Sequence, residues 1–256
     1  MAVARELLLR GANSTRTQLL LGSSKAVHVI EDVVTAAQAH TLVQELEPVL
    51  QRRRYERNHW DQVIIGYKEV ERPFWDDATN QATIDSVRRH IEELVCSGET
   101  AARGLPASSQ AKSETIEWLP THVIDLAADG HITPHVDSIK FSGELVCGLS
   151  LLSPAIMTLT FDAEAAAADT PPPGTVEGVG AAEGGEGNDE DAQVKLLLPP
   201  RSLYVLSGNA RYHFAHSIEK SVEEDDNSGV RAARNVFGPS FQRERRISLI
   251  FRDTKV

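Results

Sequence analysis

The sequence predicts a mainly β protein of the α+β class, with short strands arranged as a sandwich or jelly roll and helices packed against one side. Two helical patterns occupy the N-terminal part of the chain. From His122 onward, the chain consists of short apolar or alternating runs that are separated by Gly and Pro. The length of 256 residues suits one domain with a sizeable core, or at most two small ones.

Two segments have the periodicity of amphipathic helices. In residues 35–50, Ala, Leu and Val recur at three- and four-residue spacing, and Thr35 is placed to cap the start. In residues 79–95 a similar apolar stripe ends just before Gly98, a residue that favours helix termination. We expect both helices to support a sheet rather than to carry function.

The β-type part contains seven short segments that are apolar or alternate between apolar and polar residues. They comprise residues 122–126, 146–152, 156–161, 194–198, 203–206, 212–218 and 247–251. Many short strands that follow two helices are typical of a jelly roll with helices on one side.

Residues 163–193 interrupt the β pattern. They are rich in Ala, Gly, Pro and acidic residues and contain almost no large apolar side chain, so burial cannot offset their ordering entropy. We interpret them as a disordered acidic insertion in a hairpin between residues 156–161 and 194–198.

The net charge of the chain is −11, and nine acidic residues lie between positions 162 and 191 without a Lys or Arg. The remaining chain is therefore near neutral, without the broad basic surface that DNA binding usually needs.

Residues 1–24 have the composition of an organellar transit peptide, with three Arg, several Ser and Thr, two runs of Leu and a single acid. An ordinary frayed terminus is the alternative. The folded domain is then expected to comprise residues 25–256.

The two cysteines, Cys96 and Cys147, cannot build a disulfide framework, which favours a reducing compartment. No apolar run approaches the roughly 18 residues of a membrane span.

A candidate metal site is formed by His135 and Asp137 together with a histidine far along the chain. Residues at i and i+2 lie on one face of an extended segment, so both side chains can reach one metal ion. Two histidines and one carboxylate, with positions left open, are the ligand set of non-haem Fe(II) oxygenases. The distal ligand is either His213 or His216, which alternation places on opposite faces of the strand.

A candidate anion site lies on the C-terminal strand. Alternation puts Arg246, Ser248, Ile250 and Arg252 on one face. An arginine that faces an interior needs an anionic partner, because an unpaired buried charge is costly. A small carboxylate supplies that partner through charge-assisted hydrogen bonds, which makes Arg246 the candidate carboxylate-binding residue.

Residues 130–143 and 148–154 resemble the AlkB-type Fe(II)/2-oxoglutarate dioxygenases, and most closely their mitochondrial branch. The resemblance continues in order through residues 202–208, the spacing of Arg211 and His216, and the spacing of Arg246 and Arg252. It extends upstream into residues 46–55 and 59–61. It therefore covers roughly residues 33–252 without the acidic insertion.

The resemblance implies a double-stranded β-helix that binds Fe(II) and uses 2-oxoglutarate and O2. It makes His135, Asp137 and His216 the iron ligands. It makes Arg246 the residue that binds the distal carboxylate of 2-oxoglutarate, with Arg252 and the Tyr204 hydroxyl supporting the same site. The implied reaction converts 2-oxoglutarate to succinate and CO2 while oxidising a C–H bond. The implied location is the mitochondrial matrix.

One departure from the family concerns the substrate. Base-repairing members carry an Asn and a Tyr in the strand before the H-x-D turn, whereas this chain has Asp125 and Ala127 near those positions. Because an extruded base is held by stacking and edge contacts, DNA is an improbable substrate. We expect a protein or metabolite substrate. The alternatives are oxidative demethylation of RNA, with Arg52–Arg54 and Arg57 on the phosphates, and an iron-binding regulatory scaffold. For these arginines a solvated helix end is the simpler interpretation.

Overall fold

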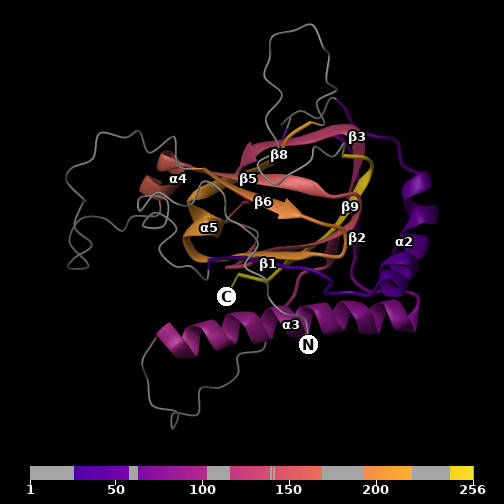
Figure 1. The fold of residues 1–256 in the computed structure, drawn as a ribbon, viewed down its shortest axis with the longest axis horizontal. Coiled ribbons are helices and arrows are strands. Elements are labelled where there is room, and N and C mark those ends of the chain that lie inside the picture. Colours follow the sequence, from indigo (N-terminus) through magenta and orange to yellow (C-terminus); the bar gives the residue numbers. More distant parts are fainter. Residues whose placement is uncertain are drawn as a thin grey trace, which may run out of the picture.

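The fold is an antiparallel sheet of nine strands that wraps around a common interior and carries two long helices outside it. The computed structural model describes residues 26–57, 63–102, 116–138, 140, 142–168, 193–220 and 243–255, and the side chains of 96–102 are excluded. Figure 1 shows the strands around one interior, with α3 beneath them and α2 at one side. The elements are β1 (Val27–Ile30), α2 (Ala36–Gln51), β2 (Ile64–Arg72), α3 (Ala78–Ala102), β3 (Thr121–His135), β4 (Val146–Leu152), β5 (Ala155–Phe161), α4 (Ala163–Ala168), β6 (Gln193–Leu198), β7 (Leu203–Leu206), α5 (Gly208–Tyr212), β8 (Phe214–Ile218) and β9 (Arg246–Arg252).

Strand β3 joins the two halves of the sheet. The strand order is β1-β7-β4-β9-β3-β8-β5-β6, with β2 paired to β3 off this path. The first half of β3, from His122 to Leu126, pairs with β9, and its last residues pair with β8. One long strand therefore takes part in both halves and folds the sheet back on itself. The predicted fold class, a double-stranded β-helix with supporting N-terminal helices, is confirmed.

The two faces of the sheet bury two different hydrophobic clusters. The outer cluster joins α2 and α3 to the sheet through residues such as Leu46, Ile91 and Leu249. The inner cluster lines the space that the strands enclose and includes Leu126, Tyr204 and Ile250. Because side chains alternate along a strand, residues of β9 that share the face of Ile250 point inward. By this alternation, the polar residues Arg246, Ser248 and Arg252 of β9 point to the interior.

Helix α2 matches the prediction closely, and α3 is longer than predicted. Thr35 caps α2 through a reciprocal capping box with Gln38. Helix α3 continues past Gly98 to Ala102, so the predicted end at Val95 was wrong. A glycine inside a helix costs only about 1 kcal/mol relative to Ala, and the helix continues into two alanines.

Strands β1 and β2 were not predicted, and β3 is longer than its apolar run. Gly130 continues β3 instead of interrupting it, because it packs directly on Gly66 of β2. A Cβ at Gly130 would lie 2.6 Å from the Gly66 carbonyl oxygen. The buried guanidinium of Arg243 also donates to the carbonyls of Ala127, Ala128 and Gly130. These contacts support the irregular middle of the strand that leads to His135.

The hairpin that contains the acidic insertion is present, because β5 pairs antiparallel with β6. The predicted boundaries of the insertion, 163–193, need correction at both ends. Residues Ala163–Ala168 form helix α4, and Gln193 already pairs in β6. The helix forms because alanine has the highest helix propensity and Asp162 accepts a hydrogen bond from Ala165 N. The rest of the segment lies outside the described residues, as does the predicted transit peptide at 1–24.

Replacement of residues 169–192 by a short turn is expected to leave activity and melting temperature nearly unchanged. The closure entropy of a loop grows slowly with length, by about 0.6 kcal/mol per doubling. Thermal unfolding and succinate formation of the shortened protein measure the effect. A loss of turnover with an unchanged melting temperature would instead identify the segment as a lid or a docking element.

Candidate metal and cosubstrate site

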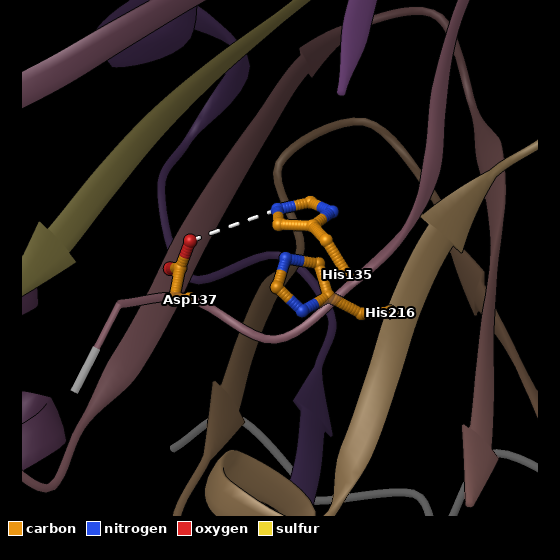
Figure 2. A group of neighbouring side chains, drawn as sticks. All are labelled: His135, Asp137 and His216. Carbon is orange, nitrogen blue, oxygen red and sulfur yellow. Dashed lines mark ion pairs between the residues drawn. The ribbon is translucent and has the colours of Figure 1, made fainter. Parts of the chain in front are cut away.

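Strands β3 and β8 bring the two histidines of the predicted metal site face to face. His135 is the last residue of β3 and pairs directly with His216 of β8. Asp137 follows two residues later, outside the strand. The candidate ligand atoms of these three residues lie within 4.8 Å of one another, and Figure 2 shows the side chains converging. Of the two candidate distal histidines, the structure places His216 beside His135 and Asp137, whereas His213 lies at the end of α5.

The geometry of the three side chains leaves ligand atoms directed at a common point. His135 Nε2 lies 3.6 Å from Asp137 Oδ1, the contact drawn as a dashed line in Figure 2, and the two imidazole centroids are 4.2 Å apart. His135 Nδ1 lies 2.9 Å from the carbonyl oxygen of Thr133. Because a carbonyl only accepts hydrogen bonds, Nδ1 carries the proton and Nε2 keeps its lone pair for a metal ion.

The ionisation states also suit a divalent cation. Burial raises the pKa of Asp137, but the neighbouring His135 and the charge of Arg252 outweigh it and hold this pKa far below its usual range. Burial and the neighbouring His135 lower the pKa of His216 to about 4. At neutral pH the site therefore presents an ionised carboxylate and a neutral imidazole, which are the forms that bind Fe(II).

Arg252 contacts the predicted metal ligand directly. Its Nε lies 3.2 Å from Asp137 Oδ2, and its Nη2 lies 3.5 Å from Oδ1. The sequence assigned Arg252 to the cosubstrate site. In the structure, the guanidinium of Arg252 bonds the carboxylate of Asp137. A contact between Arg252 and a bound cosubstrate would therefore lie next to the candidate metal site.

Arg246 lies in the interior with hydrogen-bonding capacity to spare. It is 2% exposed, and its Nη2 donates to Ser150 Oγ at 2.9 Å. Its Nε and the Ser248 hydroxyl are buried without a partner among the described residues. Burial lowers the pKa of Arg246 to about 10, and the nearby Tyr204 opposes this shift, so the guanidinium stays charged at pH 7. Unused donors beside a buried cation fit a carboxylate such as that of 2-oxoglutarate.

Tyr204 projects from β7 into the same interior and is 3% exposed. Its ring lies against Gly148 of β4, where a Cβ atom would come within 2.6 Å of the hydroxyl oxygen. Glycine at this position therefore makes room for the phenol. Burial raises the pKa of Tyr204, so the hydroxyl stays protonated and can donate a hydrogen bond to an anion.

Sequence reasoning missed Ser150 and assigned no role to Ser248. Alternation had already placed Ser248 on the face of Arg246, which was the available signal. Ser150 pairs with Ser248 across β4 and β9, and only the register of that pairing brings it to Arg246. The sequence of β4 does not show that β9 lies beside it, so the contact between Ser150 and Arg246 could not be predicted.

The strand before the H-x-D turn requires a further correction. Ile124 and Leu126 belong to the inner cluster, so they occupy the inward positions of β3. Asp125 faces the helices instead, where it is 0% exposed and accepts two hydrogen bonds of 2.9 Å from Arg245. Asp125 therefore does not line the site. The inward positions Ile124 and Leu126 are apolar.

Comparisons with known proteins agree with this geometry. No family model matches the chain. The mouse protein named "Alpha-ketoglutarate-dependent dioxygenase alkB homolog 7, mitochondrial" is 38% identical over 183 residues, which cover 72% of this chain and 62% of the mouse protein. The bovine protein of the same name is 37% identical over 220 residues, which cover 86% of this chain and 74% of the bovine protein.

Solved structures support the fold. A prolyl hydroxylase from Trichoplax adhaerens, in complex with a hypoxia inducible factor peptide fragment, has a TM-score of 0.52 and 10% identity, and covers 96% of this chain and 90% of its own. A Pseudomonas putida prolyl-4-hydroxylase has a TM-score of 0.50 and 11% identity, and covers 94% of this chain and 100% of its own. These likenesses concern the fold alone. The similarity in sequence to the bovine protein shows that the chain belongs to the AlkB homologue family of alpha-ketoglutarate-dependent dioxygenases.

Proposed function

We propose that this chain is a mitochondrial Fe(II)- and 2-oxoglutarate-dependent dioxygenase that hydroxylates a protein or small-molecule substrate and releases succinate and CO2. The observation that carries the proposal is the convergence of His135, Asp137 and His216 in one interior with the buried, incompletely bonded Arg246. The mitochondrial location, in the matrix, is supported by the names of the mouse and bovine relatives and by the composition of residues 1–24.

Each residue of the site has a distinct task in this reaction. His135, Asp137 and His216 would hold the iron and leave three positions for cosubstrate and O2. When bound, the iron supplies the redox chemistry that couples decarboxylation of 2-oxoglutarate to oxidation of a C–H bond. Arg246, with the hydroxyls of Ser150, Ser248 and Tyr204, would bind the distal carboxylate and so fix the orientation of the cosubstrate.

The choice of substrate class rests on the inner face of β3. Two neighbouring inward residues are Ile124 and Leu126, which offer neither a hydrogen bond to a base edge nor an aromatic ring for stacking. A protein or metabolite substrate is therefore favoured. RNA demethylation is the second candidate, because Arg52, Arg53 and Arg54 are all exposed and free to follow phosphates.

The chain presents no helix among its described residues that is long and apolar enough to cross a membrane. We expect its partners to be a protein or small-molecule substrate, with RNA as the alternative and DNA disfavoured.

The proposal is tested by incubating pure protein with Fe(II), ascorbate, 2-oxoglutarate and O2 in the presence of mitochondrial protein, metabolite or RNA fractions. Succinate formation above the substrate-free background is expected with the protein or metabolite fraction. A rise with RNA alone, lost in an Arg52/Arg53/Arg54 triple alanine variant, would select demethylation instead. If no fraction raises succinate and the background itself is absent, the chain is an iron-binding scaffold.

A further inference from the structure

The three predicted metal ligands differ in what holds them in place. His135 and His216 lie in paired strands and face each other across the β3–β8 ladder. Asp137 lies beyond the end of β3, in the loop that leads to β4, and no strand pairing fixes its backbone. Its carboxylate can stay at the metal position only if this loop is held by other contacts. The source of those contacts is therefore part of how the site is built.

Arg211 of α5 supplies them from inside the fold. Its Nη1 donates to the backbone carbonyl of Asp137 at 2.8 Å, and its Nη2 donates to Ser142 Oγ at 2.8 Å and lies 3.4 Å from the carbonyl of Ser138. All three acceptors belong to the loop that carries Asp137. One planar guanidinium thus joins the beginning of the loop to a residue near its end.

The burial of Arg211 shows that this contact is built into the fold. The side chain is 2% exposed, and Ser142 is 4% exposed. Among the described residues, no carboxylate lies within ion-pair distance of Arg211, so its charge rests on carbonyl and hydroxyl oxygens. A buried charge is costly without such partners, so the guanidinium and the loop constrain each other.

We propose that Arg211 is a positioning residue for the metal centre, which holds the backbone of Asp137 while Arg252 holds its carboxylate. The inference rests on the proposed function, because it assumes that Asp137 binds the metal. Arg211 acts through the loop and does not touch the metal or the cosubstrate. Its loss should therefore weaken metal binding without changing the recognition of 2-oxoglutarate at Arg246.

The test is a titration of purified protein with Mn(II), a redox-stable probe of the Fe(II) site, followed by the electron paramagnetic resonance signal of the free ion. Arg211→Met is expected to raise the Kd for Mn(II) by roughly 10- to 100-fold, the range typical of groups that orient metal ligands. At saturating iron, the KM for 2-oxoglutarate should stay at the wild-type value. Arg211→Lys should recover part of the affinity, because an ammonium group can bond Asp137 O but cannot also span to Ser142.

Arg88 offers a matched control on the opposite side of the sheet. Its Nη2 also bonds a backbone carbonyl, that of Leu119, and a hydroxyl, that of Thr121, and its Nε is likewise buried without a partner. Both guanidinium groups also lie near an aromatic ring. Arg88→Met should lower the melting temperature to a similar degree as Arg211→Met and leave the Kd for Mn(II) unchanged.

Ser142→Ala provides a milder variant if Arg211→Met does not fold, and it should raise the Kd for Mn(II) by a smaller factor in the same direction. Wild-type affinity in both the Arg211 and Ser142 variants, with Asp137→Ala unable to bind, would overturn the positioning role and leave the metal site intact. Failure of the wild type to bind Mn(II) would overturn the metal site and this inference together.

Discussion

Asp137→Ala is expected to abolish iron retention and succinate formation while the protein still unfolds cooperatively. The substitution removes the one anionic ligand of the three, whose low pKa keeps it ionised at all physiological pH values. The two histidines remain held by the β3–β8 ladder, so the fold should persist. Metal content after gel filtration, succinate formation and circular dichroism melting measure the three parts of this expectation.

Asp129→Ala is the appropriate control for this variant. Asp129 lies on the same strand and pairs with Arg57 at 2.6 Å, but that ion pair is exposed to solvent. Exposed pairs contribute little, so iron content and turnover should equal those of the wild type. Near-normal turnover of Asp137→Ala would show that the carboxylate is not a ligand. Loss of cooperative unfolding would show that it is needed for folding as well.

The elements that the sequence predicts well are those whose pattern is local. Helix α2 carries its own capping box and a continuous apolar stripe, and both are legible without knowledge of the fold. Strand β4 is bounded by the residues that the apolar run indicates. Strands β1 and β2 have no such signal, because their burial alternates irregularly and depends on neighbours that lie far away in sequence.

The residues of the candidate site also differ in whether a local sequence pattern reveals them. His135 and Asp137 form a local motif, whereas the choice of His216 over His213 needed the family resemblance, because alternation allowed either. Ser150 and Arg211 were not assigned to the site, since their roles come from strand register and from the packing of α5 on a distant loop. The family resemblance includes the spacing of Arg211 and His216, but it does not show which groups the guanidinium of Arg211 contacts.

Register also explains why Asp125 was misplaced. Sequence position alone placed Asp125 near the expected substrate contacts. Because successive residues of β3 point to opposite faces, a shift of one position decides whether a side chain faces the interior of the sheet or the helices. Asp125 takes the helix-facing side, where it joins Arg245 and Glu47 in a charged cluster. The apolar residues Ile124 and Leu126 on the inner face of β3 are thus a structural finding that composition does not give.

Arg246→Ala is expected to raise the requirement for 2-oxoglutarate by roughly tenfold or more. Each charge-assisted hydrogen bond contributes about 1.5–3 kcal/mol, and about 1.4 kcal/mol corresponds to tenfold in affinity. The dependence of succinate formation on 2-oxoglutarate gives the KM, and the rise in melting temperature that 2-oxoglutarate causes in the metal-bound protein should shrink in parallel. An unchanged KM would assign the carboxylate to another residue.

The neighbouring Arg245 provides a control that separates cosubstrate binding from stability. It immediately precedes β9, points to the side of the sheet that the helices cover, and bonds Asp125 and Glu47. Arg245→Ala removes the main partner of the fully buried Asp125, so the free energy of unfolding should fall by ~1–3 kcal/mol while the KM for 2-oxoglutarate stays constant. Arg246→Ala should show the reverse pattern. Without cosubstrate, the buried charge of Arg246 has Ser150 as its only hydrogen-bond partner among the described residues, and it contributes little to stability. Two adjacent arginines would then differ in function solely because one faces the helices and the other faces the interior of the sheet.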